Sequence, residues 1–276
     1  MAKGDYVFGV NDSELARLEY QHRIFADHTT RLWKRAGYAR GHTVVELGAG
    51  PGFVTADLKS WLGDAGRLHA VDVSETYMAF NRTMNSHGRG CPVEFHVTDI
   101  DEAAWSGLGI ADGSVDHVFA RWLFSFLRRP EEVVQRSWNA LRPGGTVAVI
   151  DYFNFGTLKM CPEGPMFHKA YAAMLANWKT HTPTPDIAAV LPRMLSQTGF
   201  VIERIDPLML IARPGQALWS WPRLFFETQL DGLVEAGLLT AGDRSAWFEE
   251  WDRLSADPAT FFSIPGMVQI IARRPR

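Results

Sequence analysis

A run of glycines follows the first strongly apolar stretch of the chain. Gly48, Gly50 and Gly52 are spaced as G-x-G-x-G and come directly after the β-branched segment 43–47. Glycine has no Cβ, so such a loop turns tightly and lets a ligand approach the backbone. The helix expected after it presents free N–H groups at its start, which suit an anionic group. We interpret the loop as a ligand-binding turn, with a plain tight turn as the alternative.

The glycine spacing separates this loop from two common nucleotide-binding patterns. The dinucleotide fingerprint G-x-G-x-x-G would place its third glycine at the position of Phe53. The lysine-bearing phosphate loop is also absent from the sequence. The sequence therefore disfavours an NAD-dependent oxidoreductase.

Acidic residues occur at the ends of three successive apolar segments. Glu46 precedes the glycine loop, Asp72 ends the apolar run 67–73, and Asp99 follows 93–97. At the carboxyl edge of a parallel sheet these side chains would face one crevice. A carboxylate at Asp72 can accept both ribose hydroxyl protons, and one at Asp99 can accept a hydrogen bond from an adenine amino group. A plain acidic loop is the alternative for Asp99.

The elements that would position these residues alternate between strands and helices. Apolar periodicity predicts strands over 43–47, 67–73, 93–97, 115–120 and 146–151, with helices between them. Two more strands are expected over 201–211 and 267–272. The pattern predicts an α/β fold with a doubly wound, mostly parallel seven-stranded sheet and helices on both faces.

An amphipathic helix is expected before the first strand. Residues 11–36 show helical spacing of apolar residues, with Asn11 at the N-cap and Gly37 as the stop. We interpret residues 1–37 as an N-terminal helical lid.

The remaining chain, 38–276, is expected to form one domain. Helical insertions are predicted at about 155–198 and 214–256. A small separate domain over 214–256 is the alternative, although no linker of the usual composition precedes it.

Composition excludes several classes of protein. The chain has 276 residues, of which 46% are apolar and 21% charged, as in soluble globular proteins. A net charge of −3 gives no indication of a nucleic-acid partner. The two cysteines, Cys91 and Cys161, are too few for a disulfide framework or a cysteine zinc site.

No membrane span and no secretory signal are visible in the sequence, so we expect a cytoplasmic protein. The sequence leaves open whether the protein forms a homo-oligomer.

Taken in order, these segments resemble the class I S-adenosylmethionine-dependent methyltransferases. The resemblance is carried by VVELGAGPG (44–52), AVDVSETYM (70–78), VTDID (97–101), DHVFARWLFSFL (116–127) and LRPGGTVAVIDY (141–152). The stretch DSELARLEYQHRIF (12–25) is similar to the N-terminal helix of bacterial methyltransferases related to ubiquinone/menaquinone biosynthesis. The resemblance implies a Rossmann-like methyltransferase fold and S-adenosylmethionine as the cofactor.

The resemblance also implies roles for individual residues. Glu46 would orient the amino group of the cofactor, Asp72 would hold its ribose, and Arg121 would border the sulfonium. Glu46 replaces the more common aspartate, and Arg121 stands where a small or polar residue is common. The expected cofactor-binding residues are Glu46, Gly48, Ala49, Gly50, Gly52, Asp72, Val73, Tyr77, Asp99, Ile100 and Arg121, with Met78 as the alternative to Tyr77 on the adenine face.

The chain has ten tryptophans, and several lie outside the predicted sheet. Small-molecule pockets are mostly apolar and aromatic. We therefore expect a subset of the aromatic residues to line an acceptor cavity roofed by 1–36, 152–180 and 214–256; ordinary core packing is the alternative. The expected substrate-binding residues are Gln21, Trp122, Phe126, Trp178 and Phe225.

Methyl transfer from a sulfonium is an in-line displacement in which positioning supplies much of the rate enhancement. Such a reaction leaves no fixed catalytic motif in the sequence. Tyr20 and His168 are the candidates for accepting a proton after transfer. His22 and His28 are six residues apart and do not share a helical face, so no metal is expected.

These observations favour transfer of a methyl group to a carbon or oxygen of a hydrophobic small molecule in secondary metabolism. A prenylated or terpenoid acceptor is one option. The alternative is a protein of the same fold that binds the cofactor without methyl transfer, as a cyclase or regulator. Base-methylating enzymes often carry an Asn/Asp-Pro-Pro-aromatic motif where this chain has 121–124, RWLF, so a nucleic-acid substrate is disfavoured.

Overall fold

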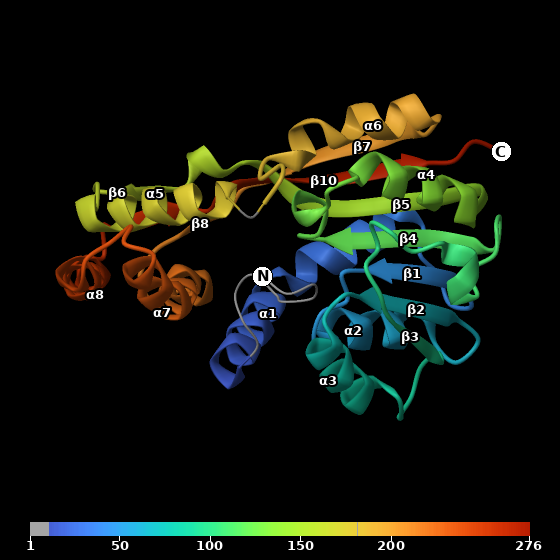
Figure 1. Cartoon of the computed structure of the whole chain (residues 1–276), viewed down its shortest axis with the longest axis horizontal. Helices are drawn as coiled ribbons and strands as arrows, with labels where there is room; N and C mark the ends of the chain where they lie inside the picture. The colour runs from blue at the N-terminus through green and yellow to red at the C-terminus, as the bar shows by residue number, and fades with distance from the viewer. Residues whose placement is uncertain (1–10, 181) are drawn as a thin grey trace.

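A seven-stranded sheet forms the centre of the molecule in the computed structural model, which describes residues 11–180 and 182–276 (Figure 1). The strand order is β3-β2-β1-β4-β5-β10-β7, and β10 alone runs antiparallel to its neighbours. The predicted doubly wound, mostly parallel sheet is therefore confirmed. The strands are β1 (Thr43–Leu47), β2 (Arg67–Asp72), β3 (Val93–Val97), β4 (Val115–Arg121), β5 (Leu141–Asn154), β7 (Val201–Leu208) and β10 (Gly266–Arg273).

Alternation of side chains along the strands produces two apolar layers. Val44 and Phe119 join the core beneath α1 (Asp12–Ala36) and α2 (Phe53–Leu62). The neighbouring residues Val45 and Val118 face the opposite layer, which is covered by α4 (Pro130–Ala140) and α6 (Leu191–Thr198). Nearly every residue of the central strands is buried, as a parallel sheet covered on both faces requires. Helix α3 (Glu75–Asn85) packs against α2, β2 and β3.

Helix α1 has the ends that the sequence predicts. The side chain of Asn11 accepts a hydrogen bond from the Glu14 amide, and Gly37 ends the helix at φ 87°. The C-terminal half of the helix belongs to the core, since Leu32 and Trp33 are fully buried. The N-terminal half contacts α7 (Ser220–Glu235). Residues 1–10 of the expected lid lie outside the described residues.

Several elements gather beyond the carboxyl ends of the parallel strands, at the left of Figure 1, and we call them the distal lobe. Its helices share the apolar cluster that α1 and the sheet form, so this region does not have a core of its own. The lobe contains α5 (Pro165–Lys179), α7, α8 (Ala241–Ala256) and a small antiparallel sheet of β6 (Lys159–Cys161), β9 (Phe261–Ser263) and β8 (Ile211–Ala212).

The structure differs from the expected insertions in two respects. The small antiparallel sheet was not predicted, because strands of two or three residues are too short to show periodicity. Helix α6 falls inside the predicted insertion 155–198 but packs beside α4 on the main sheet. Among the described residues, no helix is long and apolar enough to cross a membrane.

Candidate functional site

One cavity of about 310 Å³ joins the carboxyl edge of the sheet to the distal lobe. Its sheet side is lined by the glycine loop and by residues at the ends of β1, β2 and β4, including Glu46, Gly50, Asp72 and Arg121. Its lobe side is lined by α1 and by aromatic residues. All five residues expected to bind substrate lie in this lining, namely Gln21, Trp122, Phe126, Trp178 and Phe225.

The glycines of the loop are required for different reasons. Gly48, Gly50 and Gly52 all have positive φ, at 68°, 52° and 93°. A Cβ at Gly52 would lie 2.3 Å from the side chain of Asn81, so this glycine permits close packing of the loop on α3. A Cβ at Gly50 would meet nothing within 4 Å. Gly50 therefore borders open space in the cavity, while Gly52 does not line it.

Asp72 connects the end of β2 to the glycine loop. Its carboxylate accepts hydrogen bonds from the amides of Gly50 and Ser74, both at 2.8 Å. Burial raises the pKa of Asp72, and these backbone hydrogen bonds oppose the shift. The side chain is thus held in the cavity lining beside Val73 and Tyr77, where a ribose is expected to bind.

Glu46 is buried at the other side of the loop. It is 2% exposed, and its carboxyl group accepts a hydrogen bond from the Thr55 hydroxyl at 2.7 Å. Burial raises the pKa of Glu46 to about 8. The group is therefore mostly protonated at neutral pH, and a cationic ligand would favour its ionised form.

Arg121 occupies the end of β4 and lines the cavity. Its guanidinium donates to the Thr29 hydroxyl at 3.1 Å, lies 3.3 Å from Nδ1 of His22, and stacks on the Trp122 ring at 4.6 Å. Nε2 of His22 lies 3.2 Å from the Asp57 carboxylate. Burial lowers the pKa of Arg121 to about 10, which leaves it charged at neutral pH.

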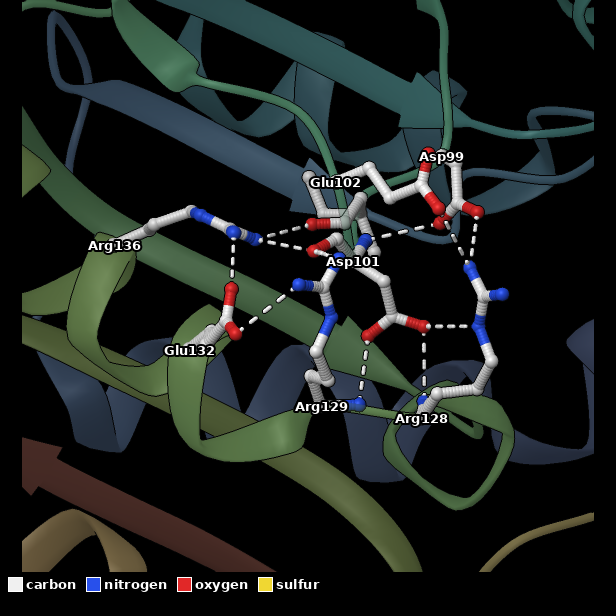
Figure 2. Close-up of polar contacts among 8 residues, drawn as sticks. Asp99, Asp101, Glu102, Arg128, Arg129, Glu132 and Arg136 are labelled. Carbon is white, nitrogen blue, oxygen red and sulfur yellow. Dashed lines mark hydrogen bonds and ion pairs between the residues drawn. The ribbon is translucent and has the colours of Figure 1, made fainter.

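Asp99 lies in a charged network outside the cavity lining (Figure 2). Its carboxylate accepts a hydrogen bond from Arg128 at 2.7 Å. The neighbouring Asp101 accepts from the backbone amides of Arg128 and Arg129, at 2.9 and 3.1 Å. This network fixes the loop after β3 against the loop between β4 and α4. Ile100 also lies outside the lining, and adenine recognition by this pair stays a prediction.

A buried carboxyl group holds the segment that carries two of the cavity aromatics. Asp151, at 0% exposure, accepts hydrogen bonds from the amides of Phe124 at 3.0 Å and Tyr152 at 2.9 Å. Burial raises the pKa of Asp151 to about 7. The segment is strained, because Trp122 has φ 55°, which non-glycine residues rarely adopt. The sequence alone does not indicate this role, because Asp151 looks like an ordinary strand end.

Polar contacts between α1 and α7 close the roof of the cavity. The side-chain oxygen Oε1 of Gln21 accepts hydrogen bonds from Nε1 of Trp221 and from Arg17, both at 2.8 Å. Arg17 also pairs with the buried Glu14 at 2.6 Å. This polar cluster fixes the position of Gln21 beside the aromatic lining.

The two residues proposed to accept a proton are not in the cavity lining. The Tyr20 hydroxyl donates to the Ala217 carbonyl at 2.6 Å. His168 follows Phe167 on α5, and its ring contacts the Phe167 ring edge to face. Neither residue therefore borders the space in which the acceptor is expected to bind, and their role in proton transfer stays a prediction.

Comparison with known proteins identifies the family of the region that contains the glycine loop. Residues 45–149 match the family described as a methyltransferase domain. This region is a class I S-adenosylmethionine-dependent methyltransferase domain. The match includes β1, the glycine loop and Asp72, and ends within β5. S-adenosylmethionine is accordingly the cofactor that this domain would bind at the loop.

Individual proteins resemble this chain, in sequence or in fold, over more than residues 45–149. The ubiquinone/menaquinone biosynthesis C-methyltransferase UbiE of Klebsiella pneumoniae subsp. pneumoniae is 26% identical over 156 residues, which are 54% of this chain and 60% of that protein. The chain thus aligns with less than two thirds of the length of this curated relative. The solved geranyl diphosphate C-methyltransferase of Streptomyces coelicolor A3(2) shares the fold, with a TM-score of 0.53, 16% identity, and coverage of 92% of this chain and 77% of that one. The [4+2]-cyclase SpnF has the same TM-score and identity, with coverage of 90% and 81%.

Proposed function

We propose that the protein transfers a methyl group from S-adenosylmethionine to a hydrophobic small molecule. The observation that carries the proposal is the continuity of the cavity. The same space is bordered by Gly50 and Asp72 on the cofactor side and by Trp178 and Phe225 on the aromatic side. An acceptor bound among the aromatic residues would therefore lie next to the cofactor.

The cavity favours an acceptor that needs little help from a base. Its described lining contains no histidine, cysteine or lysine. Its acidic side chains are Glu46 and Asp72, both on the cofactor side. On the lobe side, the Tyr171 hydroxyl donates to the Phe155 carbonyl at 2.6 Å, and burial raises the pKa of Tyr171. An enolate, a phenolate or an electron-rich alkene fits these conditions.

The residues present would mainly orient the two reactants. In the transfer, an electron pair of the acceptor attacks the methyl carbon while the sulfur–carbon bond breaks and its electrons return to sulfur. The nucleophile must lie about 3–3.5 Å from that carbon and in line with the breaking bond. Trp122 and Phe126, held by Asp151 through the loop after β4, would position the acceptor and exclude water. Glu46 would accept a hydrogen bond from the cofactor amino group.

A prenylated or terpenoid acceptor in secondary metabolism is the finer proposal. Methylation of an alkene carbon creates a carbocation, which aromatic faces stabilise. Loss of a proton from the neighbouring carbon to water then restores the double bond. The ring of Trp178 packs edge to face against Phe126 and Phe155, so several aromatic rings surround the space an alkene would fill. We also propose that the protein is cytoplasmic. Its binding partner would be this small molecule.

Incubation with methyl-labelled S-adenosylmethionine and a panel of prenylated, phenolic and enolic acceptors tests the proposal. We expect label in an acceptor with the wild type and none with Gly50→Val, in which the side chain fills the cofactor space. Conversion of an acceptor without label, in a reaction that still needs the cofactor, would instead establish the cyclase alternative.

A further inference from the structure

A cluster of three potential metal ligands lies on the sheet away from the cavity. His69 is on β2, and Glu94 and His96 are on β3. His69 is the register partner of Glu94, and His96 lies two residues further along the same strand. The three side chains therefore project from one face of the sheet, because residues two apart on a strand point the same way. One ligand atom of each lies within 4.8 Å of the others.

We propose that this cluster binds a divalent transition-metal ion of the zinc class. Nδ1 of His69 lies 3.2 Å from Nε2 of His96 and 3.6 Å from Oε2 of Glu94. In a tetrahedral zinc site with ligands at 2.0–2.1 Å, neighbouring ligand atoms are about 3.4 Å apart. The two distances are close to this spacing. Two imidazole nitrogens and one carboxylate oxygen suit Zn²⁺, whereas Mg²⁺ and Ca²⁺ prefer oxygen ligands.

A histidine–histidine hydrogen bond accounts for only part of this geometry. Nδ1 of His69 faces both the nitrogen of His96 and the carboxylate oxygen of Glu94, and one N–H cannot point well at both. A cation would interact favourably with all three electron pairs.

The surroundings leave the site accessible. His69 is 3% exposed, but Glu94 is 43% exposed, so water can reach the open fourth position. Arg67 lies 3.4 Å from the other carboxylate oxygen, Oε1, and its side chain is 59% exposed. Exposed ion pairs at this distance contribute little. Arg67 therefore leaves Oε2 free to face the histidines.

The bound ion would join the edge strand β3 to β2. Within residues 11–180 and 182–276, β3 pairs with β2 alone and is therefore an edge strand. His69 precedes Asp72 by three positions on β2, and the loop after β3 carries Asp99. Metal binding would therefore stabilise the side of the sheet that borders the cofactor site without contributing an atom to the cavity lining.

Titration of the whole, tag-free and chelator-stripped protein with ZnSO₄ in a calorimeter tests the proposal. We expect one ion per chain, a higher melting temperature with Zn²⁺, and no binding of Mg²⁺. His96→Gln and Glu94→Gln should each weaken Zn²⁺ binding by more than about tenfold, or about 1.4 kcal/mol. His87→Gln is the matched control, because this histidine is exposed and outside the cluster, and it should leave binding unchanged.

Co²⁺ provides a second readout, since its visible absorption reports tetrahedral coordination. The absorption should appear in the wild type and in His87→Gln and disappear in His96→Gln. Retained binding of S-adenosylhomocysteine by His96→Gln would show that the variant is folded. The proposal is overturned if Zn²⁺ does not bind, or if all three variants bind it as the wild type does.

Discussion

The buried carboxyl group of Glu46 on β1 accepts a hydrogen bond of 2.7 Å from the Thr55 hydroxyl on α2, and the glycine loop connects these two elements. The contact holds a group whose pKa burial raises to about 8 in the unliganded protein. A cationic amino group beside Glu46 would favour the ionised form. Ligand binding below pH 8 must therefore release a proton from this site.

Affinity for S-adenosylhomocysteine should accordingly rise with pH. Between pH 6 and 8 we expect an increase of up to about tenfold per pH unit, because less free energy is spent on removing the Glu46 proton. Calorimetry in two buffers of different ionisation enthalpy would detect the released proton. Glu46→Gln should bind more weakly at pH 8 and lose this dependence. An unchanged slope in Glu46→Gln would assign the proton to another group.

Substitutions of Gly50 and Gly52 should distinguish a glycine that leaves room for the ligand from one that permits close packing of the loop. Gly50→Ala places its Cβ in open space, so we expect a stability cost of about 1–2 kcal/mol from positive φ together with loss of cofactor binding. Gly52→Ala has the same backbone strain and also collides with Asn81, which should add about 1–3 kcal/mol of destabilisation. Urea unfolding and cofactor titration of both variants would measure these effects. Normal cofactor binding by Gly50→Ala would mean that the loop is only a turn.

Asp72 at the end of β2 and Asp99 after β3 can be compared with each other. Asp72→Ala should weaken cofactor binding by at least about tenfold, or 1.4 kcal/mol, without unfolding the protein. Asp99→Asn should weaken it as well if this carboxylate contacts adenine. Arg128→Gln is the control, because it breaks the same ion pair but keeps the Asp99 carboxylate. Equal losses in Asp99→Asn and Arg128→Gln would assign Asp99 a purely structural role.

Asp151 should affect the acceptor side of the reaction. Asp151→Ala leaves the buried amides of Phe124 and Tyr152 without this acceptor, at a cost to stability of about 1–3 kcal/mol each. The variant should reduce the rate of methyl transfer more than the affinity for the cofactor.

Burial raises the pKa of Asp151 from 3.8 to about 7 in the folded state. The folded state thus holds this proton more tightly than the unfolded state, so the contribution to the free energy of unfolding decreases as pH rises from about 4 to 7.

Denaturant unfolding at pH 5 and pH 8 would measure this contribution. Asp151→Asn, which keeps one acceptor oxygen, should show a smaller decrease between the two pH values than the wild type. The same decrease in both proteins would contradict the assignment of that proton to Asp151.

Acceptor binding should depend on Phe225. Phe225→Ala enlarges the aromatic side of the cavity, so we expect a higher KM for the acceptor and an unchanged Kd for the cofactor. Phe248→Ala is the matched control, because Phe248 is also partly buried in the same apolar cluster but does not line the cavity. Steady-state kinetics with the acceptor found in the labelling experiment would decide. Equal changes in KM for the two variants would indicate a general loosening of the lobe.

The fold and the cofactor side of the site could be predicted because their signals are local. Apolar residues mark the four largely buried strands β1, β2, β4 and β5 and the half-buried edge strand β3; the glycine loop follows β1 directly, and Asp72 ends β2. β5 extends beyond its predicted range, 146–151, to Leu141–Asn154, since pairing with β4 and β10 includes residues whose types do not favour a strand. The expected strand over 201–211 is divided between β7 and β8, which belong to different sheets.

The acceptor side was harder to predict because it depends on contacts between distant segments. On α1 the cavity is lined by Arg17, Leu18 and Gln21, which share one face, while Tyr20 points toward Ala217. A helical pattern predicts a buried face but not which part of that face meets a ligand. The contribution of Tyr171 depends on its contact with Phe155 in the turn that follows β5, which no local pattern indicates.

The continuity of α1 limits how the cavity can open. The same 25-residue helix supplies the roof near Gln21 and the fully buried Leu32 and Trp33 beside the sheet. An outward movement of the part of α1 near Gln21 would require breaking the helix or removing Leu32 and Trp33 from the core. A bulky acceptor would therefore have to enter by displacement of α7 and its neighbours in the distal lobe, while α1 keeps its position.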